Sequence, residues 1–393
     1  MSARMAAPIR GRAGYLARVW IMAAIGLRMM AHDRLKTVGT LLGVVFATVL
    51  SFQQLGTFLG LLQKNTMLAD NVAADLWVTP RGLPTLQDTA PMSMSVLYRA
   101  RTAPGVAWAE PMLYGGAAAK VPGGTTEAMT VIGTRLPRGA GGPWNIVAGA
   151  TSDLAWPDAM FFDDNQRDKL GGLNLGSVRE VNGHRVRAVG FTWGLQPFGP
   201  PYAFADFDTA RSLLRIASDQ THFVLAGVAP GRDVEAVRRA LQARLPDAEV
   251  LTKAQMQQKI VRYLLTQSSL GISFGTSTLF ALIVGFVIVG LTMFSAVVDN
   301  LREFGTLKAI GATNGDLALV LLVQSVVFAL AGSLVGLTLA TKMADGIRSA
   351  DLALVLPPWL FGATLAAMVV MCVTASSLAL LRVRGVEPGM VFR

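Results

Sequence analysis

The sequence predicts a membrane α-helical protein with four transmembrane helices and a large α+β domain inserted between the first and second spans. Hydrophobic residues make up 52% of the 393 residues and charged residues only 15%, whereas a soluble domain is typically about 25% charged. Long apolar runs occupy residues 38–62, 270–298, 317–341 and 356–381. A Gly- and Pro-rich block at 63–265 follows the first run, and it is long enough to bury a core of its own.

The N-terminal segment 1–37 is strongly basic. It carries seven arginine and lysine side chains against a single acidic residue, Asp33. Residues 15–30 are apolar on one side and basic at the ends, and Trp20 suits the headgroup region of a membrane. This pattern predicts an amphipathic helix on the cytoplasmic membrane surface, with an irregular basic tail as the alternative.

The apolar run 38–62 predicts the first transmembrane helix. As a helix it would be about 37 Å long, which exceeds the roughly 30 Å of hydrocarbon in a bilayer. It has no small-residue cleavage site, so we expect it to be retained rather than removed as a signal peptide. Basic residues precede it and only Lys64 follows shortly after, which predicts a cytoplasmic N-terminus.

The block 63–265 is predicted to be an α+β domain of two lobes. Short β-type runs occupy residues 75–79, 129–132 and 186–190, the last directly after an Asn-Gly turn signal at 182–183. Residues 135–200 form the more irregular, β-rich lobe.

A βαβ-like unit is predicted near the end of this domain. Residues 223–228 have the pattern of a strand, 233–245 that of an amphipathic helix, and 249–251 that of a return strand. A shorter helix is expected to begin at Asp208 as its N-cap and to end at Ile216. The apolar face of the longer helix is formed by Val234, Val237, Leu241 and Leu245.

Four spans place both termini on the same side of the membrane. With a cytoplasmic N-terminus, the domain 63–265 and the loop 342–355 are outside, whereas the segment 299–316 and the tail 382–393 are inside. The charges agree, because arginine and lysine lie beside the spans on the predicted inner side. These inner basic residues are Arg302, Lys308, Arg382, Arg384 and Arg393.

The sequence has no catalytic pattern. It lacks the phosphate-binding G-x-x-x-x-G-K-[ST] loop, the G-x-S-x-G elbow and the H-E-x-x-H zinc motif. The adjacent carboxylates Asp163 and Asp164 are more typical of a solvated turn than of a catalytic or calcium site. We therefore expect no catalytic residue, bound cofactor or metal in this chain.

Metal, disulfide and nucleic-acid chemistry are also disfavoured. The histidines at 32, 184 and 222 have no ligand spacing, and the single cysteine, Cys372, lies in a predicted span and has no partner for a disulfide. The net charge of +10 is concentrated beside apolar spans, without an aromatic-interleaved basic patch. We expect a membrane lipid environment and no nucleic acid partner.

The four predicted spans contain no Asp, Glu, Lys or Arg. Ion-coupled carriers and proton pumps normally keep such groups in their pathway, so the sequence predicts a membrane part that moves as a rigid body. Glycines at small-xxx-small spacing let helices approach closely, and they mark either a dimer seam or packing within one chain. The pairs are Gly39/Gly43, Gly56/Gly60, Gly271/Gly275 and Gly332/Gly336.

The segment 299–313 is short and charged, and it lies between two apolar runs. Its apolar residues recur every three positions, which predicts a helix with a broad apolar face, and Gly311 suits its C-cap. Thr313 and Asp316 can form a capping box for the next span. We expect this helix to push on both neighbouring spans when a partner docks on it, with a plain solvated loop as the alternative. The expected docking residues are Leu301, Arg302, Glu303, Phe304, Thr306, Leu307, Lys308 and Ile310.

Three stretches resemble the permease subunits of MacB/FtsX/LolC-type ABC transporters, most closely the DevC-like branch. Residues 302–312 (REFGTLKAIGA) resemble the family's signature segment after the second span. Residues 75–78 (DLWV) are similar to the start of its periplasmic domain, and 387–392 (EPGMVF) resemble its C-terminal tail. The order of spans and outer domain matches over essentially the whole chain.

This resemblance implies a non-enzymatic subunit that pairs with separate cytoplasmic ATPase subunits, which would hold the ATP and Mg. The segment 299–312 would be the coupling helix that contacts the ATPase, and its motion would be transmitted to the periplasmic domain. The family's permeases form homodimers or heterodimers, and we expect a homodimer. DevC-like members resemble parts of tripartite pumps, in which a membrane-fusion adaptor and an outer-membrane duct export glycolipids or other amphiphiles.

We therefore expect a permease subunit of an ABC exporter in the bacterial inner membrane. The expected cargo is lipid-like or amphiphilic. Two alternatives remain from the same resemblance: a LolC-like lipoprotein-release permease, and an FtsX-like regulator of a cell-wall hydrolase.

Overall fold

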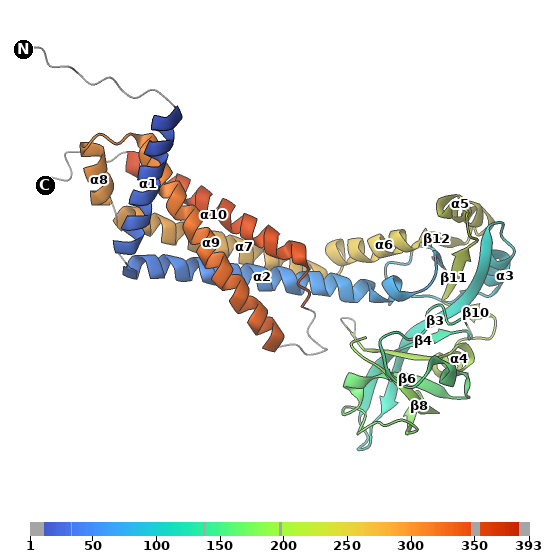
Figure 1. The fold of residues 1–393 in the computed structure, drawn as a ribbon. Helices are drawn as coiled ribbons and strands as arrows, with labels where there is room; N and C mark the ends of the chain where they lie inside the picture. The colour runs from blue at the N-terminus through green and yellow to red at the C-terminus, as the bar shows by residue number, and fades with distance from the viewer. Residues whose placement is uncertain are drawn as a thin grey trace, which may run out of the picture. The chain divides into compact units, whose positions relative to one another are not determined.

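A computed structural model describes residues 12–32, 34–136, 138–195, 199–299, 301–346 and 354–384. The chain divides into two compact units (Figure 1). The membrane unit comprises Met1–Phe58, Phe274–Arg348 and Leu354–Arg393, and the outer unit comprises Leu59–Ser273 and Ser349–Ala353. The predicted N-terminal segment before residue 12, residues 347–353 of the loop 342–355 and the tail beyond residue 384 lie outside the described residues.

Among the described residues, four helices are long and apolar enough to cross a membrane. Three of them contain a predicted span in full, and the fourth begins at Pro358, two residues after the predicted start of the last span. The predicted fold class is thereby confirmed. The first and second of these helices enclose the outer domain in the sequence. The helices that build the membrane unit, wholly or in part, are α1 (Arg12–His32), α2 (Arg34–Asn71), α7 (Ser269–Asp299), α8 (Leu301–Ala309), α9 (Asn314–Gly346) and α10 (Pro358–Arg384).

The core of the membrane unit lies where α2, α7, α9 and α10 meet. Val44 of α2, Phe328 of α9 and Met368 of α10 are buried in one apolar cluster, together with Cys372. This packing is apolar throughout the cluster, as expected for helices held by close side-chain contact in lipid.

Several glycines of the predicted pairs lie where α2 contacts other helices of the same chain. A Cβ on Gly332 would lie 2.6 Å from Val44 Cγ1, and one on Gly43 would lie 2.8 Å from Thr292 Cγ2. A Cβ on Gly336 would lie 2.8 Å from Thr48 Cβ. The sequence left two interpretations of these pairs, a dimer seam and packing within one chain, and these three glycines pack within one chain. A Cβ on Gly56 or Gly271 would also lie against residues of the same chain, and Gly60 is buried. A Cβ on Gly275 would lie 3.9 Å from Phe58, and one on Gly39 would have no atom within 4 Å.

The outer unit is built on a ten-stranded sheet with the order β12-β1-β11-β3-β4-β9-β6-β8-β5, and β7 pairs with both β3 and β8. Strands β3, β4, β9, β6, β8 and β7 therefore form a closed circuit. The strands are β1 (Leu76–Pro80), β2 (Met92–Ser93), β3 (Val106–Lys120), β4 (Thr126–Thr134), β5 (Ile146–Ala148), β6 (Ala159–Asp163), β7 (Val178–Val181), β8 (His184–Thr192), β9 (Tyr202–Asp206), β10 (Gln220–Thr221), β11 (Phe223–Val228) and β12 (Ala248–Thr252), with β2 and β10 forming a separate pair.

Two faces of strand β1 pack against different partners, because successive side chains of a strand point to opposite sides. Leu76 and Val78 lie in a cluster with α3 and α5, whereas Trp77 lies in a second cluster that includes the end of α2 and α6. The helices of the outer unit are α3 (Ser95–Arg101), α4 (Phe207–Leu214), α5 (Val234–Arg244) and α6 (Lys253–Thr266), with short 3₁₀ turns at Thr151–Ala155 and Asp164–Gln166.

The predicted βαβ-like unit is present, but β1 lies between its two strands. Strands β11 and β12 both pair antiparallel with β1, so they run parallel to each other without touching. The helix between them, α5, is capped by Asp233, whose carboxylate accepts hydrogen bonds from the N–H groups of Glu235 and Ala236.

The predicted N-cap of the shorter helix is wrong by two residues. Helix α4 is capped by Asp206, which accepts from the N–H of Asp208 at 3.1 Å. Asp208 instead lies in the first turn and pairs with Arg211. The earlier start lets Phe207 enter the core, where it is buried.

Candidate functional site

Helix α8 joins two of the membrane helices, α7 and α9, and it ends in a tight reversal at Gly311. The backbone of Gly311 has φ +104°, a conformation that side chains with a Cβ strongly disfavour. Its N–H donates to the carbonyl of Lys308 at 3.0 Å, and the N–H of Ala312 donates to that of Leu307 at 2.9 Å. These two bonds form a Schellman motif, which satisfies carbonyls that the helix end would leave unpaired.

The next helix, α9, begins with a reciprocal capping box. The N–H of Asp316 donates to Thr313 Oγ1 at 3.3 Å, and the N–H of Thr313 donates to Asp316 Oδ2 at 2.7 Å. The Thr313 hydroxyl adds a third bond to the same carboxylate oxygen at 2.6 Å. The carboxylate also lies at the positive end of the α9 dipole. The four residues 310–313 therefore connect two helices whose facing ends are both capped, which leaves this connection little conformational freedom.

The inner face of α8 is anchored by Phe304. Its side chain is 1% exposed and packs with Leu317, Val320 and Leu321 of α9. Partly buried Met22 and Met29 of α1 complete the cluster. The expectation that Phe304 forms part of the docking surface is therefore corrected, because its ring is covered by the chain's own helices.

Helix α1 is clamped to α9 beside this cluster. The Gln324 carboxamide donates from Nε2 to the carbonyl of Gly26 at 3.1 Å, a buried bond between residues 298 positions apart. Gly26 permits this approach, because a Cβ there would lie 3.3 Å from the carbonyl oxygen of Val320. The segment predicted as an amphipathic helix is thus a helix that packs on α9, and its position at a membrane surface stays a prediction.

The outer face of α8 presents the remaining described docking residues. Glu303 and Thr306 are exposed, Leu307 and Lys308 are half-buried, and Ile310 at the C-cap is 80% exposed. The side chains of Leu301 and Arg302 lie outside the described residues. Glu303 in the first turn and Lys308 in the last turn both complement the helix dipole.

A cleft of about 440 Å³ lies beside the start of α9. It is lined by Val19 of α1 and by the first two turns of α9, including Thr313, Asp316 and Leu319.

In the outer unit, α6 is bonded to the end of α2. Lys253 Nζ donates to the carbonyl of Asp70 at 2.6 Å and to that of Val72 at 3.3 Å, and Gln257 donates to the Asp70 carboxylate. A lysine at the carbonyl end of a helix is favoured by the helix dipole. The apolar residues Leu68 and Ile260 continue this contact in one cluster.

The acidic pair at 163–164 is a structural turn, although not the solvated one that we expected. Asp163 is fully buried and accepts from the N–H of Leu195 at 2.8 Å and from the side chain of Asn165 at 2.7 Å. Burial raises the pKa of this carboxyl above its ordinary value. Among the residues that the structure describes, no group of three His, Cys, Asp or Glu side chains could hold a metal ion.

Two family models together cover most of the chain. The MacB-like periplasmic core domain matches residues 37–244, and the FtsX-like permease C-terminal domain matches residues 252–388. The chain belongs to the MacB/FtsX family of ABC transporter permeases. The family is the permease component of its transporters, and it accounts for a multi-pass membrane protein with a MacB-like core domain between the first two spans.

Individual relatives are distant from this permease. An uncharacterized ABC transporter permease from Methanocaldococcus jannaschii is 28% identical over 141 residues, which is 33% of each chain. The permease thus spans about one third of the length of the curated relative that it matches. The DevC-like assignment stays a prediction.

Three solved structures are similar to part of the chain. The periplasmic region of MacB from Actinobacillus actinomycetemcomitans has 9% identity and a TM-score of 0.38, covering 49% of this chain and 94% of that one. The extracellular domain of the transporter YknZ from Gram-positive bacteria has 13% identity and a TM-score of 0.34, with 46% and 99% covered. A domain of a putative permease from Porphyromonas gingivalis has 13% identity and a TM-score of 0.33, with 46% and 89% covered.

Sequence reasoning missed two features of these sites. Helix α6 was not foreseen, although its buried residues Met256, Ile260 and Leu264 recur at helical spacing. The bond between Gln324 and Gly26 had no signal in the sequence, because a glutamine in a span does not reveal its partner.

Proposed function

We propose that this permease receives mechanical work from a separate cytoplasmic ABC ATPase at α8 and passes it to the outer domain. ATP and Mg would be bound by the ATPase, and α8 would act as the coupling helix. In this orientation both termini and α8 face the cytoplasm of a bacterial cell, and the outer unit faces the periplasm.

The observation that carries this proposal is the way in which α8 is held. Its ends are closed by the Schellman motif at Gly311 and the capping box at Thr313, and its inner face is anchored by buried Phe304. Because α8 is fixed in this way, it would not move independently of its neighbours. A force on its outer face would therefore displace α9 and α1 together with it. The exposed residues Glu303, Thr306 and Ile310 form the surface on which the load would act.

The path from the membrane to the outer domain runs along the chain itself. Helix α2 continues without interruption to Asn71, and α6 leads into α7 over two residues. Lys253 bonds the end of α2 to the start of α6, so the two segments that enter the outer domain move together. The absence of Asp, Glu, Lys and Arg from the four predicted spans supports rigid-body motion rather than ion coupling.

The assembly that we propose is a homodimer of this permease with two ATPase subunits. It would act in a tripartite pump with a periplasmic adaptor and an outer-membrane duct, and its cargo would be lipid-like or amphiphilic. Support for these finer points comes from the resemblance of residues 302–312 to the family's signature segment and from the order of the spans.

The substitution Ile310→Asp tests the docking surface. It places a charge on a side chain that is 80% exposed, so we expect insertion and folding to be retained while ATPase association falls at least tenfold. The measurement is the amount of ABC ATPase that co-purifies with the full chain in mild detergent, identified by mass spectrometry.

Val147→Asp is the matched control, because Val147 is an apolar residue of the outer unit that is 56% exposed. Its variant should retain the ATPase. Co-purification that is unchanged in Ile310→Asp, or lost equally in both variants, would refute docking at α8.

A further inference from the structure

A cleft of about 660 Å³ opens in the outer unit where the turn after β1 meets β12 and α6. Its charged lining consists of Arg81, Glu249, Lys259 and Arg262. Lys259 is paired with Glu249, which leaves the two arginines as the uncompensated charges. Both arginines are exposed, and neither makes an ion pair with a residue that the structure describes.

Helix α6 presents the basic side of the cleft on one face. Lys259, Arg262 and Tyr263 are three and four residues apart, so they lie on the same side of the helix. The neighbouring face of the same helix is fixed in the core by Met256 and Ile260. The helix therefore cannot rotate to withdraw these groups.

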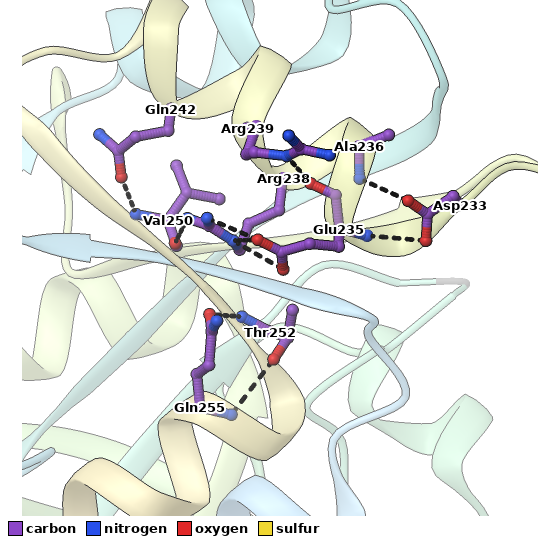
Figure 2. A network of polar contacts seen from close by, with 9 residues as sticks. All are labelled: Asp233, Glu235, Ala236, Arg238, Arg239, Gln242, Val250, Thr252 and Gln255. Atoms are coloured by element: carbon purple, nitrogen blue, oxygen red, sulfur yellow. Dashed lines mark hydrogen bonds and ion pairs between the residues drawn. The ribbon is translucent and has the colours of Figure 1, made fainter.

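The wall formed by β12 is held by a network of polar contacts (Figure 2). Gln242 of α5 donates from Nε2 to the carbonyl of Ala248 at 2.9 Å and accepts from the N–H of Val250 at 2.8 Å. Thr252 and Gln255 form a reciprocal capping box that starts α6 directly after β12. The strand, the turn and the helix that carry Glu249 and Lys259 are thus fixed relative to one another.

Tyr263 also borders a second, smaller cavity of about 60 Å³. Its lining is mixed: Leu86, Leu264 and Leu270 lie beside Asn65 and Gln87. Leu270 is the second residue of α7, a candidate membrane span, and α6 ends at Thr266. The cationic cleft and this small cavity are therefore both bordered by Tyr263, a few residues before the chain enters a candidate span.

We infer that this cleft binds the phosphate group of an anionic amphiphile, with Arg81 and Arg262 as its ligands. A guanidinium presents a planar fork of N–H donors that matches phosphate oxygens in bidentate geometry. Arginine and tyrosine beside a span also suit the headgroup layer of a membrane, where lipid phosphates are the abundant anions. The binding needs no ATPase, so this inference does not depend on docking at α8.

The test uses the full chain in neutral detergent and isothermal titration calorimetry with three probes. These are short-chain dihexanoyl phosphatidylglycerol, its zwitterionic phosphatidylcholine counterpart and inorganic phosphate. We expect phosphatidylglycerol to bind at least tenfold more tightly than phosphatidylcholine. In the double variant Arg81→Gln with Arg262→Gln, this binding should weaken at least tenfold.

The matched control is Arg185→Gln with Arg232→Gln, which removes the same charge from exposed arginines of the same domain outside the cleft. It should bind phosphatidylglycerol as the native chain does, and Arg81→Lys with Arg262→Lys should retain part of the affinity. A third result would be that inorganic phosphate binds as tightly as phosphatidylglycerol and that its binding requires both cleft arginines. That result would support the site and would identify free phosphate as its ligand. Equal affinity of the cleft and control double variants would overturn the inference. Unchanged co-purification of the ATPase with the cleft variant keeps this result separate from docking at α8.

Discussion

His222 is a buried base that makes the outer domain sensitive to pH. Its Nδ1 accepts a hydrogen bond from the backbone N–H of Tyr114 at 3.2 Å, so this nitrogen must be unprotonated. The side chain is 5% exposed, and burial lowers its pKa from 6.5 to about 4. The folded domain therefore holds a neutral imidazole at a pH where an unfolded chain would hold a charged one.

The sign of the pH effect follows from this difference. Between pH 6.5 and about 4 the unfolded state binds a proton that the folded state does not, so the free energy of unfolding falls as the pH falls. From pH 7 to 4.5 the loss attributable to His222 is about 2 to 3 kcal/mol. The measurement is denaturant unfolding of the full chain in detergent, followed by tryptophan fluorescence at both pH values.

Two variants isolate the contribution of His222. His222→Gln keeps an acceptor for the Tyr114 N–H but cannot titrate, so its stability should fall by less over this range than that of the native chain. His184→Gln removes an exposed histidine and should leave the profile unchanged. Half-buried Glu110 and buried Asp163 have raised pKa values and oppose the histidine, but they are common to all three proteins. Identical profiles for native and His222→Gln chains would contradict this assignment.

At the scale of elements, the contact between α2 and α9 depends on glycine at a close approach. Gly332→Ala would place a methyl group 2.6 Å from Val44 Cγ1 in a packed cluster, so we expect a loss of about 1 to 3 kcal/mol. Val44→Ala in the same chain should restore part of it, because the deleted methyl groups make room for the added one. The measurement is the fraction of monodisperse protein that remains after heating in detergent.

Gly39→Ala is the control for this pair, because nothing lies within 4 Å of the position that its Cβ would take. A loss in the control equal to that in Gly332→Ala would show that helix glycines matter for another reason. If Val44→Ala did not restore stability to the Gly332→Ala chain, the loss would not come from the contact between these two side chains.

Elements with a strong periodic signal were predicted well, and those set by tertiary contacts were not. The four spans were evident because lipid requires long uninterrupted apolar runs. Strand β3 was missed, because Pro111 and the run of glycine and alanine at 115–119 argue against a strand. Strand β3 pairs with β4 only from Met112 onward, so at Pro111 its only neighbouring strand is β11. The N–H group that proline lacks is therefore not needed for pairing with β4.

In the candidate site, too, the features set by local sequence were predicted, whereas those set by tertiary contacts were not. The caps at Gly311, Thr313 and Asp316 are local, so residue types and spacing were sufficient to propose them. The inner and outer faces of α8 were not separable, because its apolar residues spread over a broad face. Only contact with α9 and α1 shows that Phe304 points inward and Ile310 outward.

At the scale of the whole molecule, two units share two continuous segments. Helix α2 belongs to the membrane unit up to Phe58 and to the outer unit beyond it, and α7 changes unit at Ser273. Family membership follows from the two domain models, each of which covers one part of the chain. The proposed transmission of force adds one requirement, that the ATPase engages α8 directly.

Cysteine-directed crosslinking tests that requirement, because the single native cysteine, Cys372, is buried in the membrane unit. A short thiol-reactive photocrosslinker on Ile310→Cys, with the full chain in native membranes, should capture an ABC ATPase. The same reagent on Phe304→Cys, a position that is 1% exposed, should not. Capture from position 310 and not from 304 is the predicted result. No ATPase adduct from position 310, with the thiol shown to be labelled, would contradict the account.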